Sequence, residues 1–343
     1  MRKNKVRSFL GALLRAVFCL ALALLIGLIG LTAIAFYQLQ SGGNSAGLAD
    51  AVNLAMEGGF LPLCLGGFEA GWSAELTAAA PVILTALAAA LAWQAGLYNL
   101  GLAGQYALGA AAAIEGAAWG LPWFACLLLA AAAGAAGGVI PGLLKARFQV
   151  HEALTTVLMN WICLYGVQAL LQGLNRGMGL LPDLGILIPV IAAGAALLCW
   201  GLLRYTVLGF EIRVLGDSEM MARYAGMRPG KIMVFVMALS GVLAGIGGAL
   251  AFISGELRAI PNLNLALTGP GLHGLAAAVL AGGNPLGAVP TGLVISHLAR
   301  GAAQMNAAVF PQECGEWILA LTLLLGSLLL FWGKGKREGG MKK

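Results

Sequence analysis

Few side chains in this sequence have the types and spacing that catalysis or metal binding requires. The histidines are scattered at His151, His273 and His297, and no pattern supplies a nucleophile together with its base. The six cysteines show neither C-x-x-C nor a metal-ligand spacing, and the phosphate-binding pattern G-x-x-x-x-G-K-S/T is absent. The sequence therefore predicts no catalytic residue, no metal site and no cofactor bound by this chain. We expect a protein that is not an enzyme.

The most distinctive polar stretch is Gly209–Lys231, GFEIRVLGDSEMMARYAGMRPGK, which interrupts long apolar runs. It predicts a single short helix. Asp217 or Ser218 can accept a hydrogen bond from an N–H group at the helix start. Gly226 can take the left-handed conformation that closes a helix, and Pro229 prevents its continuation.

The side chains of this short helix divide into a charged pair and an apolar side. Glu219 and Arg223 lie at positions i and i+4, where an ion pair is favourable. Met220, Met221 and Tyr224 give the helix adaptable apolar surface. A short capped helix between membrane spans is suited to receive force from a partner protein. An ordinary solvated loop fits the same pattern equally well.

The elements that must position this segment are membrane spans. Sixty per cent of the residues are hydrophobic, 10% are charged and the mean hydropathy is +0.89, whereas soluble domains carry about 25% charged residues. We therefore expect an all-α polytopic membrane protein with about ten transmembrane helices. Eight regular spans lie at Ala16–Tyr37, Leu76–Leu97, Gly101–Trp119, Leu121–Leu144, Ala153–Leu171, Gly185–Leu203, Ile232–Ile253 and Trp317–Trp332. Two less regular spans lie within Leu267–Ala303, with a break near Gly282–Pro285.

The basic residues indicate which ends of the spans face the cytoplasm, because cytoplasmic segments carry an excess of Lys and Arg. With the N-terminus inside, 17 of the 20 basic residues fall on the inner side, and only Arg176, Arg258 and Arg300 fall outside. Both termini and the segment Gly209–Lys231 are then cytoplasmic. The net charge of +6 reports this topology, so nucleic acid is not an expected partner.

The expected organisation is one membrane domain over residues 1–343. It comprises a first span (16–37), an outer loop (38–75), a first helix group (76–203), a cytoplasmic loop (204–231), a second helix group (232–332) and a basic cytoplasmic tail (333–343).

Two pairs of spans are interrupted by glycine, around Gly96–Gly109 and around Gly269–Gly292. They give the chain two pseudo-repeated halves, and interrupted spans in matching positions of two halves point to a transport site. Close helix packing at small residues is the alternative, and it explains most of the 51 glycines. Glu115 is the one clear intramembrane charge, whereas proton-coupled carriers usually need several such groups.

Four segments, in a fixed order, carry the resemblance to a known family. Pro81–Gln105 ends in AGLYNLGLAGQ, and Glu152–Ala169 reads EALTTVLMNWICLYGVQA. Gly209–Gly248 contains the polar helix followed by SGVLAGIGG, and Gly271–Pro290 reads GLHGLAAAVLAGGNPLGAVP. Together these segments resemble permeases of the simple-sugar, nucleoside and branched-chain amino-acid group of ABC importers, and nucleoside-type permeases most of all.

The chain departs from the family pattern at four positions. Ala103 stands where the family has glutamate, and Gln94 stands where a basic residue is frequent. Both changes bear on the transported compound. Ser218 replaces an asparagine at the start of the polar helix and keeps a capping side chain, and Met159 is displaced by one position.

The resemblance implies the translocation subunit of an ATP-driven importer in a prokaryotic cytoplasmic membrane. Its solute would be small and polar, a nucleoside or a simple sugar. The implied partners are an ABC ATPase that carries ATP and Mg²⁺, a second permease subunit that is a different paralogous chain, an external substrate-binding lipoprotein, and membrane lipid. The residues expected to contact the ATPase are Asp217, Ser218, Glu219, Met220, Met221, Arg223, Tyr224 and Gly226.

Four polar side chains are expected along the solute path: Asn99, Gln105, Asn160 and Asn284. Hydrogen bonding between helices is the alternative role for each of them. Two other classes of protein are alternatives to the importer subunit. An ion-coupled secondary carrier would work without an ATPase, and an intramembrane enzyme would need a catalytic set that the sequence lacks.

Overall fold

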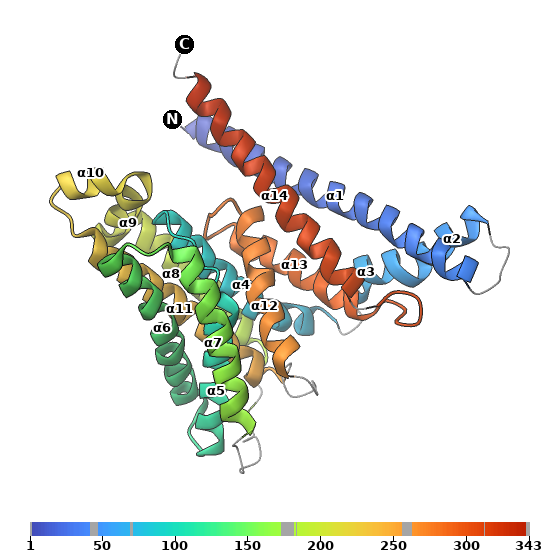
Figure 1. The fold of residues 1–343 in the computed structure, drawn as a ribbon, viewed down its shortest axis with the longest axis horizontal. Helices are drawn as coiled ribbons and strands as arrows, with labels where there is room; N and C mark the ends of the chain where they lie inside the picture. Colours follow the sequence, from blue (N-terminus) through green and yellow to red (C-terminus); the bar gives the residue numbers. More distant parts are fainter. Residues whose placement is uncertain are drawn as a thin grey trace. The chain divides into compact units, whose positions relative to one another are not determined.

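The computed structural model describes residues 2–41, 47–68, 71–172, 182, 184–255, 263–311 and 313–340, and over these residues the regular structure is entirely helical (Figure 1). The side chains of residues 2–16, 263–268 and 329–340 lie outside the described set. The chain forms two compact units. The first contains Met1–Glu75, Val279–Gly282 and Val294–Lys343, and the second contains Leu76–Ala278 and Gly283–Leu293.

The helices follow one another in this order: α1 (Arg2–Ser41), α2 (Leu48–Ala55), η1 (Met56–Phe60), α3 (Leu61–Leu65), η2 (Gly66–Phe68), α4 (Trp72–Gln94), α5 (Leu102–Ala118), α6 (Trp123–Phe148), α7 (Glu152–Gln172), α8 (Leu187–Tyr205), α9 (Val207–Asp217), α10 (Glu219–Tyr224), α11 (Pro229–Ile253), α12 (Leu263–Leu280), α13 (Ala288–Ala303) and α14 (Glu313–Gly340).

Each span expected from the sequence coincides with a helix. Long apolar runs form helices in a membrane because a helix satisfies its own backbone hydrogen bonds there. The two irregular spans of Leu267–Ala303 are α12 and α13, which are separated at residues 281–287, where the glycines and Pro285 lie. Arg176 and Arg258, two of the three basic residues expected on the outer side, lie outside the described residues.

Among the described residues, seven helices are long and apolar enough to cross a membrane. They include Leu48–Phe68, where α2, η1, α3 and η2 join into one nearly continuous helical stretch. The helices α5 and α13 are shorter, with 17 and 16 residues. The expected number of ten spans and the outer-loop assignment of residues 38–75 therefore stay predictions.

The core of the second unit is built from α4, α5 and α11. In an apolar stretch of 18 residues within each helix, 83% of the residues of α4 and 67% of those of α11 are buried. In α6, α7 and α8 the buried share of such a stretch is 28% each. Glycines bring the backbones of this core into contact. A methyl group on Gly109 of α5 would overlap the backbone of Gly245 of α11, and one on Gly134 of α6 would overlap the backbone of Gly241. These glycines serve the close packing that small residues allow between membrane helices.

The first unit contains α1 and α14 side by side (Figure 1). A Cβ atom on Gly27 would lie 2.9 Å from the Ile318 side chain, and one on Gly30 would lie 2.6 Å from the Trp317 ring. Gly30 comes after Gly27 in α1, whereas its neighbour Trp317 comes before Ile318 in α14. The two helices are therefore antiparallel. The helix ends that lead to the two chain termini are therefore on the same side of this unit.

A buried ionic cluster in the first unit was not expected from the sequence. Glu75, at the start of α4, lies 3.2 Å from Nδ1 of His297 and 3.4 Å from Nε of Arg300. His297 also bonds through Nε2 to the carbonyl oxygen of Cys64 at 2.8 Å. The side chain of Glu75 is only 4% exposed, so its charge is balanced by neighbours rather than by water. Sequence reasoning did not bring these residues together, because Glu75 and His297 are 222 positions apart in the chain.

We predict that Glu75→Gln lowers the stability of the protein by about 3 kcal/mol, because it removes the buried negative charge that faces His297 and Arg300. The melting temperature of the detergent-solubilised protein measures this effect. Glu57→Gln, at an exposed glutamate of the same unit, is the matched control. Equal melting temperatures for the two variants would show that the cluster adds no stability.

Candidate functional site

The polar segment after α8 contains two helices, where the sequence predicted one. The first, α9, begins after Thr206, whose side-chain oxygen accepts a hydrogen bond from the N–H of Gly209 at 3.0 Å. Along α9, Ile212 and Leu215 are buried. The sequence analysis predicted one helix here and missed α9, although six of its 11 residues are apolar, because the burial of Ile212 and Leu215 depends on tertiary contacts.

Helix α9 is held at both ends by glycine contacts within the second unit. A methyl group on Gly209 would overlap the backbone of Leu202 and Leu203 at the end of α8. A methyl group on Gly216 would overlap the carbonyl of Gln94, where α4 ends. The approach of Gly96 to Gly216 is equally close, since a Cβ atom on Gly96 would lie 3.3 Å from the Cα atom of Gly216. Helix α9 therefore packs closely against the end of α8 and the end of α4.

The second helix, α10, has the caps that the sequence predicted. Ser218 is its N-cap, and the serine oxygen accepts a hydrogen bond from the N–H of Met221 at 3.4 Å. At the other end Gly226 has a φ of +77°. The N–H of Gly226 bonds to the carbonyl of Arg223, and the N–H of Met227 bonds to the carbonyl of Ala222, both at 3.0 Å. This pair of bonds is a Schellman closure, which needs the left-handed conformation that glycine adopts readily.

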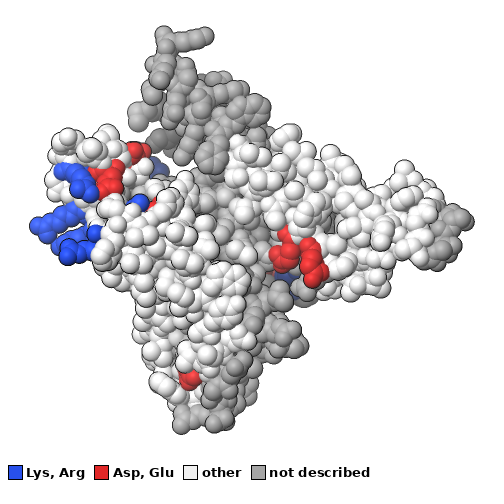
Figure 2. Space-filling view, viewed as in Figure 1, with Lys and Arg blue, Asp and Glu red and all other residues white. Residues whose placement is uncertain are grey.

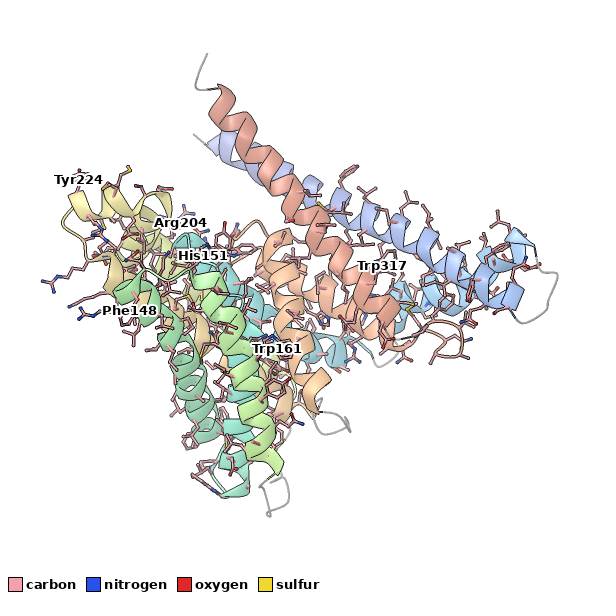
Figure 3. All side chains as sticks on the ribbon, viewed as in Figure 1. Phe148, His151, Trp161, Arg204, Tyr224 and Trp317 are labelled. Atoms are coloured by element: carbon pink, nitrogen blue, oxygen red, sulfur yellow. The ribbon has the colours of Figure 1, made fainter. Side chains whose placement is uncertain are left out.

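The side chains of α10 leave an apolar surface open to solvent. Met220, Met221 and Tyr224 are 62%, 58% and 86% exposed, whereas Ala222 is buried. Figure 3 shows Tyr224 at the outer edge of α10. The expected ion pair is formed, with Nη2 of Arg223 2.6 Å from Oε1 of Glu219. Such an exposed pair contributes only about 0.3–0.5 kcal/mol. In the space-filling view, Lys and Arg side chains gather around this end of the second unit (Figure 2).

Two of the four expected path residues lie in a buried hydrogen-bond network. The side-chain amide of Asn99 donates to Oε1 of Gln105 at 2.9 Å and to Oγ of Ser240 at 2.8 Å. Ser240 donates in turn to the carbonyl of Ala88 at 2.8 Å. Asn99 and Gln105 are 1% and 2% exposed. The network links α4, α5 and α11 at the break that separates α4 from α5, which favours a packing role for both residues.

Helix α7 supports the same break from the side. Oγ1 of Thr156 accepts a hydrogen bond from the N–H of Leu100 at 3.2 Å, and Oδ1 of Asn160 accepts one from the N–H of Gly104. Gly104 is in the first turn of α5, where N–H groups lack partners inside the helix. Asn160 therefore caps α5 from a neighbouring helix. The i, i+4 spacing of Thr156 and Asn160, which places both on one face of α7, is the sequence signal for this arrangement.

Asn284 lies apart from this network in the turn between α12 and α13. It is exposed, and its Oδ1 accepts a hydrogen bond from the N–H of Leu286 at 3.1 Å. Asn99 makes the same local contact, with its Oδ1 accepting from the N–H of Gly101 at 3.1 Å. The two asparagines thus shape two similar turns.

The same helix closure precedes both turns. The N–H of Leu97 bonds to the carbonyl of Ala92 at 3.0 Å, and the N–H of Gly283 bonds to the carbonyl of Ala278 at 3.1 Å. Gln94 joins the two regions through a 2.8 Å bond from Nε2 to the carbonyl of Gly283. Among the residues with described placement, no three His, Cys, Asp or Glu side chains gather closely enough to hold a metal ion.

Comparison with known proteins identifies the class to which this arrangement belongs. Residues 72–328 match the family described as the permease component of the branched-chain amino acid transport system. The match covers well over half of the chain, so the chain belongs to this family of transporter permeases.

Several relatives are themselves permeases of ABC transporters. The guanosine ABC transporter permease protein NupP of Bacillus subtilis (strain 168) is 32% identical over 293 residues, which cover 76% of this chain and 82% of NupP. The nucleoside ABC transporter permease protein NupB of Lactococcus lactis subsp. cremoris (strain MG1363) is 27% identical over 286 residues, 70% of this chain and 74% of NupB. The ribose import permease protein RbsC of Escherichia coli (strain K12) is 28% identical over 217 residues, 57% of this chain and 66% of RbsC.

These matches confirm that the chain is a permease subunit of an ABC transporter and a multi-pass membrane protein. The interpretation as a secondary carrier is thereby set aside. The roles of individual residues rest on the geometry of the second unit alone.

We predict that Asn160→Leu destabilises the protein by about 1 kcal/mol, because the first turn of α5 loses its cap. Asn160→Asp keeps an oxygen acceptor at a helix N-terminus and should remain closer to the wild type. Melting temperatures of the purified variants, measured together with solute uptake, test both expectations. A leucine variant that loses uptake at unchanged stability would instead assign Asn160 to the solute path.

Proposed function

We propose that this chain forms half of the membrane pathway of an importer for a nucleoside or a simple sugar. The relatives named for guanosine, nucleoside and ribose transport support this class of solute. An external binding lipoprotein delivers the solute in this proposal and sets most of the specificity. Asn160, which is partly exposed, is the strongest of the four path candidates.

The observation that carries the proposal is the exposed apolar face of α10. A helix of 6 residues is too short to be stable alone, so its caps and its neighbours must hold it. Exposed Met220, Met221 and Tyr224 suit a groove on a partner, as in helix-in-groove recognition. The partner proposed for this face is the ABC ATPase, which binds ATP and Mg²⁺ and supplies the energy that this chain does not generate.

The second permease subunit of the complex is proposed to be a different, paralogous chain. Two guanosine permease proteins of Bacillus subtilis, NupP and NupQ, both match this sequence, at 32% and 28% identity. Their coexistence in one bacterium supports a pathway assembled from two related but unequal chains. One copy of each would then complete the passage across the membrane.

The proposed topology has ten spans, both termini and α10 in the cytoplasm, and two pseudo-repeated halves. The antiparallel pairing of α1 and α14 supports termini on one side. The gathering of basic residues around α10 supports a cytoplasmic position for this end of the second unit. The matching closures and asparagine turns after α4 and α12 support the relation between the halves.

We predict that Tyr224→Ala weakens binding of the ATPase and lowers ATP-dependent uptake at least tenfold, since a large exposed aromatic contact is lost. Gly226→Val should act similarly, because a β-branched residue resists the φ of +77° that closes α10. Co-purification of the ATPase and uptake in the same cells measure both effects. Tyr37→Ala, at a tyrosine of α1 that is 73% exposed, is the matched control.

Membrane insertion should be normal in both variants, since neither position lies in a membrane-spanning helix. If both variants bind the ATPase and transport at the level of the control, α10 is only a solvated surface helix and the proposed coupling fails.

We predict that cysteines at Ser41→Cys and Tyr224→Cys become labelled from opposite sides of the membrane. Both positions are exposed, and five of the six native cysteines are buried, so background labelling is limited to Cys64. An impermeant thiol reagent added to intact cells should reach residue 41 only, whereas inside-out vesicles should label residue 224. Labelling of both residues from the outside would refute the proposed topology.

A further inference from the structure

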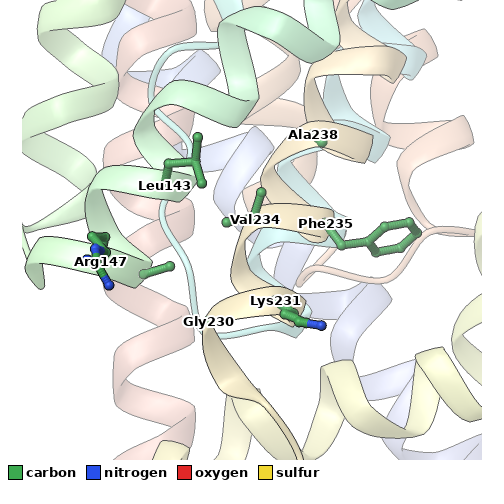
Figure 4. Close-up of a pocket in the computed structure, with 8 residues that line it drawn as sticks. Leu143, Arg147, Gly230, Lys231, Val234, Phe235 and Ala238 are labelled. Atoms are coloured by element: carbon green, nitrogen blue, oxygen red, sulfur yellow. The ribbon is translucent and has the colours of Figure 1, made fainter.

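An open apolar groove of about 660 Å³ runs between α6 and α11 in the second unit (Figure 4). Its walls are formed by side chains of both helices, and its lining is Leu143, Ala146, Arg147, Gly230, Lys231, Val234, Phe235 and Ala238. Arg147 and Lys231 are the only charged residues in this lining. In Figure 4 they lie at the same end of the groove as Gly230, while Leu143, Val234 and Phe235 lie farther along it.

The groove exists because glycines hold the two helices unusually close. A Cβ atom on Gly230 would lie 3.3 Å from the Cβ atom of Ala146, and one on Gly142 would lie 3.1 Å from the Cα atom of Val234. Large side chains cannot enter such a seam, so Leu143 and Phe235 project beside it. They are 51% and 40% exposed and form the two sides of the groove.

The basic end of the groove lies near the end of the membrane-spanning part of both helices. Arg147 is in the last turn of α6, and Lys231 is in the first turn of α11, which starts three residues after Gly226 of the α10 closure. Both side chains are exposed, and neither forms an ion pair among the described residues. Lys145, by contrast, is occupied by Glu152 at 3.0 Å. Phe148, 69% exposed, adds an aromatic side chain at the same level.

We propose that this groove binds an anionic phospholipid of the membrane leaflet that faces α10. The acyl chains lie along Leu143, Val234 and Phe235, and the phosphate of the headgroup lies between Arg147 and Lys231. Basic residues at the ends of clefts between membrane helices suit anionic headgroups, whereas the apolar length of this groove suits hydrocarbon. Charge and polarity therefore change along the groove as they do along a lipid.

A protein segment is a weaker candidate for the same groove. The lining beyond the two basic residues contains no polar side chain that could pair with the backbone of a peptide. Both helices are also candidate membrane spans, so hydrocarbon surrounds this part of the groove already. The lipid site concerns a ligand other than the transported solute, and it does not depend on the identity of that solute.

The test compares dioleoyl-phosphatidylglycerol with dioleoyl-phosphatidylcholine as probes for the purified full-length chain in detergent. Native mass spectrometry reports the lipid bound at each concentration. Each basic residue near an anionic lipid raises the affinity about fivefold. With two such residues, the wild type should bind phosphatidylglycerol roughly thirtyfold more tightly than phosphatidylcholine at low salt. The preference should shrink as the ionic strength rises, since exposed charges are screened.

Arg147→Gln combined with Lys231→Gln should abolish the preference without affecting folding, because both side chains are exposed. Arg213→Gln combined with Arg228→Gln removes the same charge from the same end of the unit outside the groove, and should leave the preference intact. Ala238→Leu should reduce phosphatidylglycerol binding while both charges remain, because it fills the groove.

Three results would overturn the proposal. The first is equal binding of the two lipids by the wild type. The second is an unchanged preference in the Arg147 and Lys231 double variant or in Ala238→Leu. The third is a double variant that loses the co-purified ATPase while keeping the lipid, which would assign the groove to a protein partner.

Discussion

Close approach of helix backbones is the constraint on which the second unit depends. Gly109, Gly134, Gly241 and Gly245 remove the side chains that would otherwise separate α5, α6 and α11. Between membrane helices there is little hydrophobic drive toward association, so packing at short range must replace it. Beside the close contact between α6 and α11, larger side chains remain exposed. A groove and a tight interface therefore occur along this one pair of helices. The break between α4 and α5 is then stabilised by Asn99 and Thr156, whose side chains accept hydrogen bonds from backbone N–H groups that need partners within the protein.

The elements that we propose as contacts for other molecules are those that the packed core leaves open. Helix α9 is fixed by backbone contacts at Gly209 and Gly216, whereas α10 keeps Tyr224 and two methionines at its surface. This division separates a part that must not move independently from a part that can bind. The side chain of Asn99, in contrast, forms hydrogen bonds with those of Gln105 and Ser240 inside the protein. Polar residues inside a membrane protein are therefore not sufficient to mark a solute path.

Much of the fold could be predicted because its signals are local. Lengths of apolar runs placed the helices, and the capping residues Ser218 and Gly226 placed α10, since a cap acts within one turn. Helix α9 could not be placed in this way because its burial depends on α4 and α8. The pairing of Glu75 with His297 joins residues 222 positions apart, and the local sequence around either residue gives no sign of the other. The contact between Asn160 and the N–H of Gly104 likewise depends on where α5 begins, which the sequence of α7 does not show.

The contact between Gly216 and the end of α4 has a mechanical consequence. Neither Gly216 nor Gly96 has a side chain, so the joint between them contains no rotamers that could absorb a displacement. A rotation imposed on α9 is therefore transferred to the last turn of α4 with little slack, at the point where the chain leaves that helix for Asn99. Such a joint also shapes how the sequence can diverge. Residues on the outer face of α10 are exposed and can be replaced by larger ones, whereas these two positions have no larger substitute that preserves the fit.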